Sequence, residues 1–138
     1  MKTFMCPYIQ CNGNAREVVE YYLSVFGGKL DMNTFGEFGL DDNPEMKDKI
    51  MHAQLTTEGG MILMVSDNPG GDFEDGSRIS ITVFGEDEEE IMGYWDKFSA
   101  DATKVLVPMS EQVWGDKFGM LVDKYGTTWQ MNISAPTT

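Results

Sequence analysis

Few side chains in this sequence could carry chemistry, because it holds one histidine and two cysteines. His52 is the side chain that ordinarily titrates near neutral pH, so it could act as a general base. Its neighbour on the same face of a predicted strand is Gln54, and no carboxylate stands at strand spacing from it. This pattern favours a hydrogen-bonded structural histidine over a catalytic one.

The two cysteines, Cys6 and Cys11, lie in one predicted strand and point to opposite faces of it, so we expect no disulfide between them. Neither Cys-x-x-Cys nor a Cys/His spacing typical of zinc sites occurs. Cys6 could be a nucleophile if a cation such as Arg78 stabilised its thiolate. The alternative is a small, buried apolar residue, the usual role of a free cysteine.

Trp114 stands beside Gly115 and Asp116 after a long predicted strand. Glycine next to a large ring lets both backbone and ring approach a ligand closely. Trp114 could therefore form a flat pocket wall that stacks on a planar or cationic ligand, or it could be a core or dimer-interface tryptophan. Trp129 points away from the face of Gln130 and is expected to pack under a helix.

Uncharged polar residues alternate with apolar ones along several predicted strands, so each set shares one face. A polar row on a concave face is hard to explain as core and indicates a wet or ligand-filled cavity. Eleven methionines could make its lining adaptable, although methionine is also an ordinary packing residue. The polar positions are Tyr8, Gln10, Ser80, Thr82, Thr128, Gln130 and Asn132.

These residues must be positioned by a chain that repeats one order of elements. A strand from Thr3 to Cys11 precedes a helix that ends at Gly27-Gly28, and three strands follow; the order then begins again at residue 78, with a helix from about Glu86 to Phe98. Each half therefore reads β-α-β-β-β. We predict two modules, 1–67 and 78–138, joined by a Gly- and Asp-rich linker at 68–77 into one domain. The other predicted strands are 29–37, 49–57, 61–66, 78–84, 104–113, 118–123 and 127–133.

Acidic residues outnumber basic ones by 23 to 10, and the net charge is −13. Without a basic patch, nucleic acid and anionic membranes are disfavoured partners. A cationic or neutral small molecule fits the charge better, although acidity can serve solubility alone. No apolar stretch resembles a signal peptide or a membrane span, so we expect a reduced, cytoplasmic protein.

A set of short motifs is distributed over nearly the whole chain: PYI (7–9), NGNA (12–15), FGG (26–28), MHAQL (51–55), GGMILM (59–64), WGDKFG (114–119) and DKYGTTW (123–129). Their order and spacing resemble the PhnB-like branch of the vicinal-oxygen-chelate superfamily, which includes glyoxalase I, extradiol dioxygenases and bleomycin-resistance proteins. The resemblance implies an α+β fold of two tandem βαβββ modules. It also implies that each module curls a mixed sheet into a half-barrel around a cavity, and that the protein is a homodimer.

Metal-dependent members of that superfamily carry one ligand on the first strand and one on the last strand of each module. Transferred by register, these positions become Cys6, Arg78, Leu63 (Met64 if the register shifts by one) and Gln130. Leucine has no lone pair, arginine is a permanent cation, and glutamine is a weak neutral ligand. We therefore expect no metal, and no other cofactor.

The resulting prediction is a metal-free, small-molecule-binding homodimer whose ligand is cationic or aromatic. The alternative is a lyase, isomerase or dioxygenase-like enzyme of the same superfamily, with a non-standard site or acid–base chemistry at His52 and Cys6. Members of the branch also carry a methyltransferase label. No strand, glycine-rich turn and helix for a nucleotide-like cofactor is present, so we do not expect that activity. The predicted ligand-binding residues are Cys6, Tyr8, Leu63, Ser80, Trp114 and Gln130.

Overall fold

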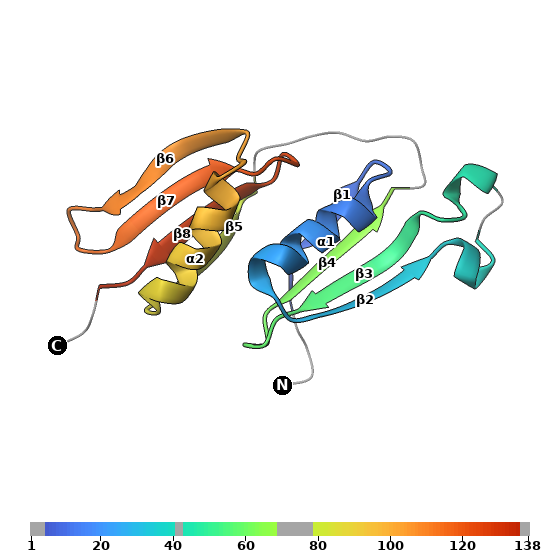
Figure 1. Cartoon of the computed structure of the whole chain (residues 1–138), viewed down its shortest axis with the longest axis horizontal. Helices are drawn as coiled ribbons and strands as arrows, with labels where there is room; N and C mark the ends of the chain where they lie inside the picture. Colours follow the sequence, from blue (N-terminus) through green and yellow to red (C-terminus); the bar gives the residue numbers. More distant parts are fainter. Residues whose placement is uncertain (1–4, 41–42, 69–78, 136–138) are drawn as a thin grey trace. The chain divides into compact units, whose positions relative to one another are not determined.

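The structure is a computed structural model that describes residues 5–40, 43–68 and 79–135. The chain divides into two compact units, Met1–Glu74 and Asp75–Thr138. In the described residues, each unit has one α-helix and one four-stranded mixed sheet (Figure 1). The predicted α+β class and the tandem β-α-β-β-β order are confirmed.

The first unit has the sheet order β1-β4-β3-β2, in which β1 runs parallel to β4 and the other neighbours are antiparallel. Two short 3-10 helices interrupt the connection between β2 and β3, where the sequence predicted only a loop. The elements are β1 (Tyr8–Cys11), α1 (Ala15–Phe26), β2 (Lys29–Thr34), η1 (Gly36–Phe38), η2 (Pro44–Met46), β3 (Ile50–Thr56) and β4 (Ile62–Asp67).

The second unit repeats this arrangement with the order β5-β8-β7-β6, in which β5 runs parallel to β8. Of the predicted linker at 68–77, only Asn68 lies in the described residues, and Arg78 lies outside them. The elements are β5 (Ile81–Gly85), α2 (Glu88–Ser99), β6 (Lys104–Glu111), β7 (Lys117–Val122) and β8 (Thr128–Ile133).

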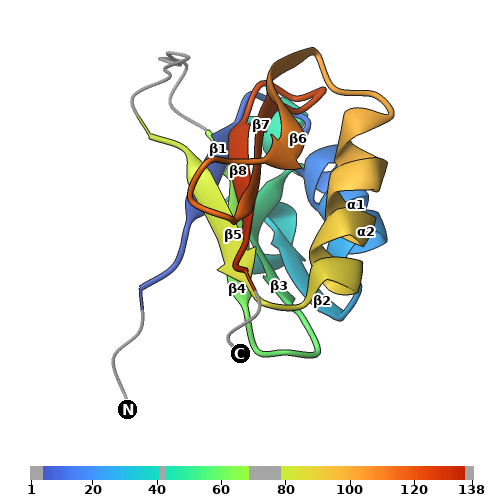
Figure 2. The same cartoon turned by 90° about the vertical axis from the view of Figure 1, so that its left-hand side faces the viewer.

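Both helices are amphipathic, and each lies on one face of the sheet of its own unit (Figure 2). The buried stripe of α1 follows helical spacing and comprises Ala15, Val18, Val19, Tyr22 and Val25. In α2 the stripe comprises Ile91, Trp95 and Phe98. The side chain of Asp87 accepts a hydrogen bond from the Glu90 amide at 3.1 Å, so α2 begins two residues later than predicted. No helix within the described ranges is long and apolar enough to cross a membrane.

Side-chain alternation divides each sheet into a helix-covered face and an opposite face. Trp129 lies on the covered side of β8, with its ring 4.9 Å from that of Phe98, as predicted. Leu63 also lies on the covered side and is 7% exposed. It pairs with the buried Leu55 and stands two residues before the buried Val65. Placing Leu63 at a concave position was therefore wrong, because the register gives that face to Met64.

A buried carboxylate joins three elements of the first unit. Asp67, at the end of β4, is 2% exposed. Its Oδ1 accepts from the amides of Gly13 and Ala15, each at 2.9 Å, and its Oδ2 accepts from the amide of Ile50 at 3.0 Å. Asp67 thus satisfies the free amides at the start of α1 and fixes where β3 begins.

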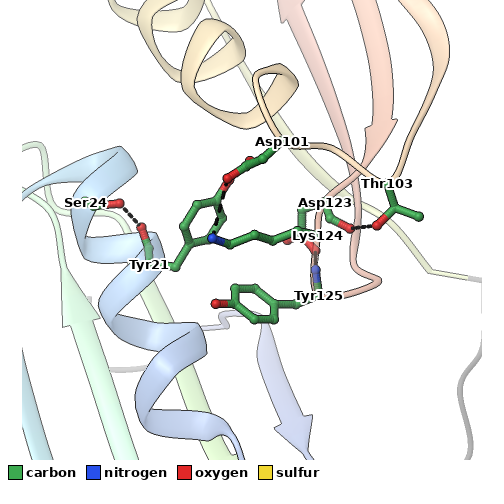
Figure 3. A network of polar contacts seen from close by, with 7 residues as sticks. All are labelled: Tyr21, Ser24, Asp101, Thr103, Asp123, Lys124 and Tyr125. Atoms are coloured by element: carbon green, nitrogen blue, oxygen red, sulfur yellow. Dashed lines mark hydrogen bonds and ion pairs between the residues drawn. The ribbon is translucent and has the colours of Figure 1, made fainter.

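The second unit has its own buried carboxylate, Asp123, which is fully buried between β7 and β8. One oxygen accepts from the amides of Tyr125 at 2.9 Å and Thr127 at 3.0 Å, and the other accepts from the Trp129 indole at 2.9 Å. The backbone carbonyl of Asp123 also accepts from the Thr103 hydroxyl at 3.0 Å (Figure 3). These bonds close the β7–β8 turn and orient the largest core side chain.

We expect Asp67→Ala to lower the free energy of unfolding by about 3 kcal/mol or more, because it leaves three amides without their acceptor. Urea denaturation measures this loss. The control is Asp48→Ala, which removes an exposed carboxylate and should change the free energy of unfolding by less than about 0.5 kcal/mol. Equal effects of the two substitutions would contradict the role of Asp67.

Two glycines of the second unit should respond in opposite ways to alanine. A Cβ at Gly119 would lie 2.7 Å from the Trp95 ring and 3.1 Å from the Met109 backbone, so Gly119→Ala should cost about 1–3 kcal/mol. Gly93 lies inside α2 with no atom within 4 Å of such a Cβ, so Gly93→Ala should add about 0.5–1 kcal/mol. Thermal unfolding of both variants tests the sign.

Candidate functional site

The polar residues predicted from alternation gather on the face of each sheet opposite its helix, which we call the helix-distal face. In the first unit, pairing in register places Tyr8 beside Met64, Gln10 beside Ser66, and Met64 beside Gln54. The strand residues of this face are Tyr8, Gln10, Lys29, Asp31, Asn33, His52, Gln54, Thr56, Ile62, Met64 and Ser66. In the second unit, the residues of β5, β7 and β8 on this face are Thr82, Phe84, Phe118, Met120, Val122, Thr128, Gln130 and Asn132.

On the first unit, the helix-distal face carries a phenol–imidazole pair. The Tyr8 hydroxyl lies 3.2 Å from Nδ1 of His52, and the two rings are 5.8 Å apart and tilted. His52 is therefore hydrogen bonded, as predicted, but its partner is a residue 44 positions away that the strand pattern does not reveal. Tyr8 is 48% exposed, so the pair is accessible from solvent within its unit.

In the second unit, the structure brings together two of the predicted ligand-binding residues. The Gln130 amide donates to the Ser80 hydroxyl at 2.9 Å. Next along β8, the Asn132 amide donates to Asp116 at 3.2 Å. Amide and hydroxyl groups can both donate and accept, so this row can bind polar groups of a ligand without changing its own charge.

Trp114 lies at the tip of the β6–β7 hairpin and is 62% exposed, so it is not a core residue of its unit. The hairpin closes through a hydrogen bond from the Gln112 amide to the Asp116 carbonyl at 2.7 Å. Gly115 has a φ of +98°, which glycine adopts without strain. This turn leaves the Trp114 ring accessible at the end of the sheet.

Asp116 was not among the predicted site residues, although the WGDKFG motif contains it. The backbone amide of Ala135, at 2.8 Å, is the main reason that the pKa of Asp116 is lowered; Asn132 and the Trp114 indole add smaller contributions. No local pattern in the sequence indicates this role, because two of these three donors come from residues beyond β7. The carboxylate ties the hairpin to the end of β8.

The registers also correct the positions transferred from metal-dependent relatives. Thr82 pairs with Gln130 as Tyr8 pairs with Met64, so Met64 and Gln130 are equivalent. Two residues before Tyr8 and Thr82 stand Cys6 and Ser80. Ser80, not Arg78, is thus the counterpart of Cys6.

The corrected donors are one thiol, one thioether, one hydroxyl and one amide, in place of the imidazoles and carboxylates that divalent metals prefer. Across the described ranges, no three His, Cys, Asp or Glu side chains cluster as a metal site would need. The residues therefore do not fit the metal of those relatives. Cys6 is half-buried and Cys11 buried, and no disulfide joins them.

Residues 3–132 match the family model described as 3-demethylubiquinone-9 3-methyltransferase. The chain belongs to this family. It is 31% identical to PA1353 from Pseudomonas aeruginosa, with a TM-score of 0.81 over 98% of this chain and 100% of that one. The PhnB protein from Bacillus cereus, a putative 3-demethylubiquinone-9 3-methyltransferase, is 27% identical, with a TM-score of 0.74 over 96% and 100%. Protein YjdN of Escherichia coli K12 is 26% identical over 94% of both chains.

A more distant comparison concerns the fold alone. A glyoxylase/bleomycin resistance protein/dioxygenase domain from Frankia sp. EAN1pec is 10% identical, with a TM-score of 0.69 over 100% of this chain and 96% of that one. The predicted resemblance to the PhnB-like branch is confirmed by the family model and the Bacillus cereus PhnB protein, and the fold is that of the Frankia domain.

The lowered pKa of Asp116 predicts a pH dependence. Because the folded state favours the ionised carboxylate, Asp116 stabilises the fold above its unfolded pKa, and this stabilisation is lost as pH falls through the lower, folded pKa. Carboxyl 13C NMR should show the Asp116 midpoint rise towards its ordinary value in Asn132→Ala, which removes one donor. Between pH 5 and pH 2.5, we expect Asp116→Asn to lose less unfolding free energy than the wild type. An unchanged midpoint in Asn132→Ala would contradict the contribution of that amide.

Proposed function

We propose that this protein binds a small molecule on the helix-distal faces of its modules, without a metal and as a homodimer. One observation carries the proposal: hydrogen-bonding side chains, paired as Gln130 with Ser80, occupy the face of the second sheet where a core would be apolar. Such a row is stable only where it meets water or the polar groups of a ligand. The row can therefore recognise a ligand.

The exposed aromatic residues indicate the kind of ligand. Trp114 and Tyr8 each present a large ring to solvent within their own unit. Rings of this kind bind planar groups by stacking, and cations through the ring face. A net charge of −13 favours a cation over an anion. We propose a planar ligand that is neutral or positively charged.

The proposal that no metal is bound rests on the chemistry of the side chains at the expected ligand positions. Cys6 and Met64 in one module, and Ser80 and Gln130 in the other, stand at the positions that metal-dependent relatives use. Hydroxyl and neutral amide groups are weak ligands for Zn²⁺, Ni²⁺ or Fe²⁺. Cys6 and Cys11 form no disulfide with each other, which is compatible with the reducing cytoplasm that we propose as the location.

The homodimer rests first on the family resemblance. In addition, β5 lies at the edge of its sheet and carries Phe84 on its helix-distal face, 75% exposed within the chain. Exposed apolar side chains beside a strand edge favour association with another surface. Sedimentation analysis of the purified protein tests this, and a monomer at all concentrations would exclude the dimer.

A second candidate function is a lyase or isomerase that uses His52. The observation in its favour is the hydrogen bond between Tyr8 and His52, which gives the imidazole a fixed orientation. Methyl transfer, the reaction in the family description, has less support. The turn before α1 has one glycine, and the amides there already donate to Asp67, so this turn offers no open site to a nucleotide-like cofactor.

Binding and metal content can be measured on the same tag-free protein. We expect substoichiometric metal by mass spectrometry and no stabilisation by Ni²⁺, Zn²⁺, Mn²⁺ or Fe²⁺ in thermal-shift titrations. In NMR titrations with planar cations and planar neutral molecules, Gln130→Ala should weaken binding at least tenfold, or about 1.4 kcal/mol. Ser80→Ala should weaken it less, because Gln130 remains.

The matched control is Ser24→Ala, since Ser24 is exposed on α1, which covers the opposite side of the first sheet from its helix-distal face. Wild-type affinity in this control and weakened affinity in Gln130→Ala would support the site. One tightly bound metal per chain, or wild-type affinity in Gln130→Ala, would overturn the proposal. A reaction that His52→Ala abolishes would favour the enzyme.

A further inference from the structure

The β6–β7 hairpin carries the exposed Trp114 at its tip. Two backbone hydrogen bonds close its tip: from the amide of Gln112 to the carbonyl of Asp116 at 2.7 Å, and from the amide of Gly115 to the carbonyl of Gln112 at 2.9 Å. The β6–β7 ladder then continues with Glu111 opposite Lys117, and Lys117 also pairs with Ile133, the last residue of β8. These bonds shape the tip, but none of them reaches Ala135, which follows β8.

The Asp116 carboxylate supplies that link. Its Oδ1 accepts from the Ala135 amide at 2.8 Å, and its Oδ2 accepts from the Asn132 amide group at 3.2 Å. Trp114 stands two residues earlier, in the turn that the backbone bonds of Gln112 with Asp116 and of Gly115 with Gln112 close. One side chain therefore connects the turn that carries the exposed ring, the polar row on β8 and the backbone beyond β8.

Asp116 differs from the two carboxylates that hold the fold together. Within residues 5–40, 43–68 and 79–135, Asp67 accepts from three backbone amides, and Asp123 accepts from backbone amides and from the buried Trp129 indole. Asp116 is only half-buried, and it holds a side chain, Asn132, that lies on the helix-distal face. Closing the hairpin onto the backbone beyond β8 requires only the bond to Ala135, so the bond to the Asn132 side chain is an additional contact on the helix-distal face.

We propose that Asp116 is a positioning residue for ligand binding. It holds the turn that carries the Trp114 ring and the Asn132 amide in a fixed relation, so that a planar cation stacks on the ring while its positively charged edge faces the carbonyl oxygen of that amide. This inference rests on the proposed function and adds the ligand class and the residue that organises its site. Fixing both groups beforehand lowers the conformational entropy lost on binding.

The probes for this proposal are N-methylquinolinium, a planar cation; quinoline at pH 8, a planar neutral molecule; and tetramethylammonium, a cation without a plane. Trp95 and Trp129 are buried, so quenching of tryptophan fluorescence reports mainly on Trp114. We expect the affinity order N-methylquinolinium, then quinoline, then tetramethylammonium. Trp114→Ala should remove most of the binding, and NMR titration measures it where the fluorophore is lost.

Asp116→Ala should weaken N-methylquinolinium binding at least tenfold. Asp96→Ala removes the same charge from the exposed surface of α2 and should change the affinity less than twofold. If Asp116 acts through the ring, the effects of Asp116→Ala and Trp114→Ala will be less than additive in the double variant. In protein labelled with 5-fluorotryptophan, the 19F resonance of Trp114 should be single and sharp, and Asp116→Ala should broaden or shift it. A purely structural role would leave the binding cycle additive.

Asp116→Asn provides a second variant in case Asp116→Ala unfolds, because it keeps the shape and one acceptor oxygen. Binding of N-methylquinolinium within twofold of wild type in both variants would overturn the proposal, as would a preference for tetramethylammonium. If other small molecules bind through Ser80 and Gln130 while Asp116 has no effect, this inference fails and the proposed function stands. If no probe shifts any helix-distal resonance of the wild type, both fail.

Discussion

The first module depends on one buried carboxylate, whose hydrogen-bond partners in the described residues are backbone amides. Asp67 is removed from water, and its cost is offset because three amides from two other elements converge on its two oxygens. Those amides lie at the start of α1 and the start of β3. This contact therefore ties the start of the helix to the end of β4 and to the start of β3 in the sheet that the helix covers.

The second module also buries a carboxylate, Asp123, but at a different position of the repeat. The two repeats have therefore diverged at these positions. By register, Thr57 and Asp123 occupy equivalent positions before the last hairpin turn of their modules. The Thr57 hydroxyl accepts from the Met61 amide at 3.0 Å, just as Asp123 accepts from the Thr127 amide. A hydroxyl is enough for a turn alone, whereas the carboxylate also bonds the Trp129 indole. The turn is common to both modules, and the tryptophan anchor belongs to one.

Periodicity in the sequence predicted the order of elements, both helices and the alternation of the strands, since these depend on neighbours within a few positions. It could not decide between Leu63 and Met64, because register depends on pairing with another strand and a shift of one residue exchanges the faces. The contact of Tyr8 with His52 and that of Asp116 with Ala135 join residues distant in sequence, so no local pattern contains them. The corrected equivalence of Ser80 with Cys6 likewise required the strand pairing. The ligand, the metal-free state and the dimer stay predictions.

The reach of Asp67 along the chain also matters during synthesis. Its partners at Gly13 and Ala15 leave the ribosome 54 and 52 residues ahead of it. Until residue 67 emerges, α1 has no acceptor for these amides and the first sheet has no β4 between β1 and β3. The contacts of the first module can therefore be completed only after residue 67 has left the ribosome. The module can then fold as a unit while the second half of the chain is still being made.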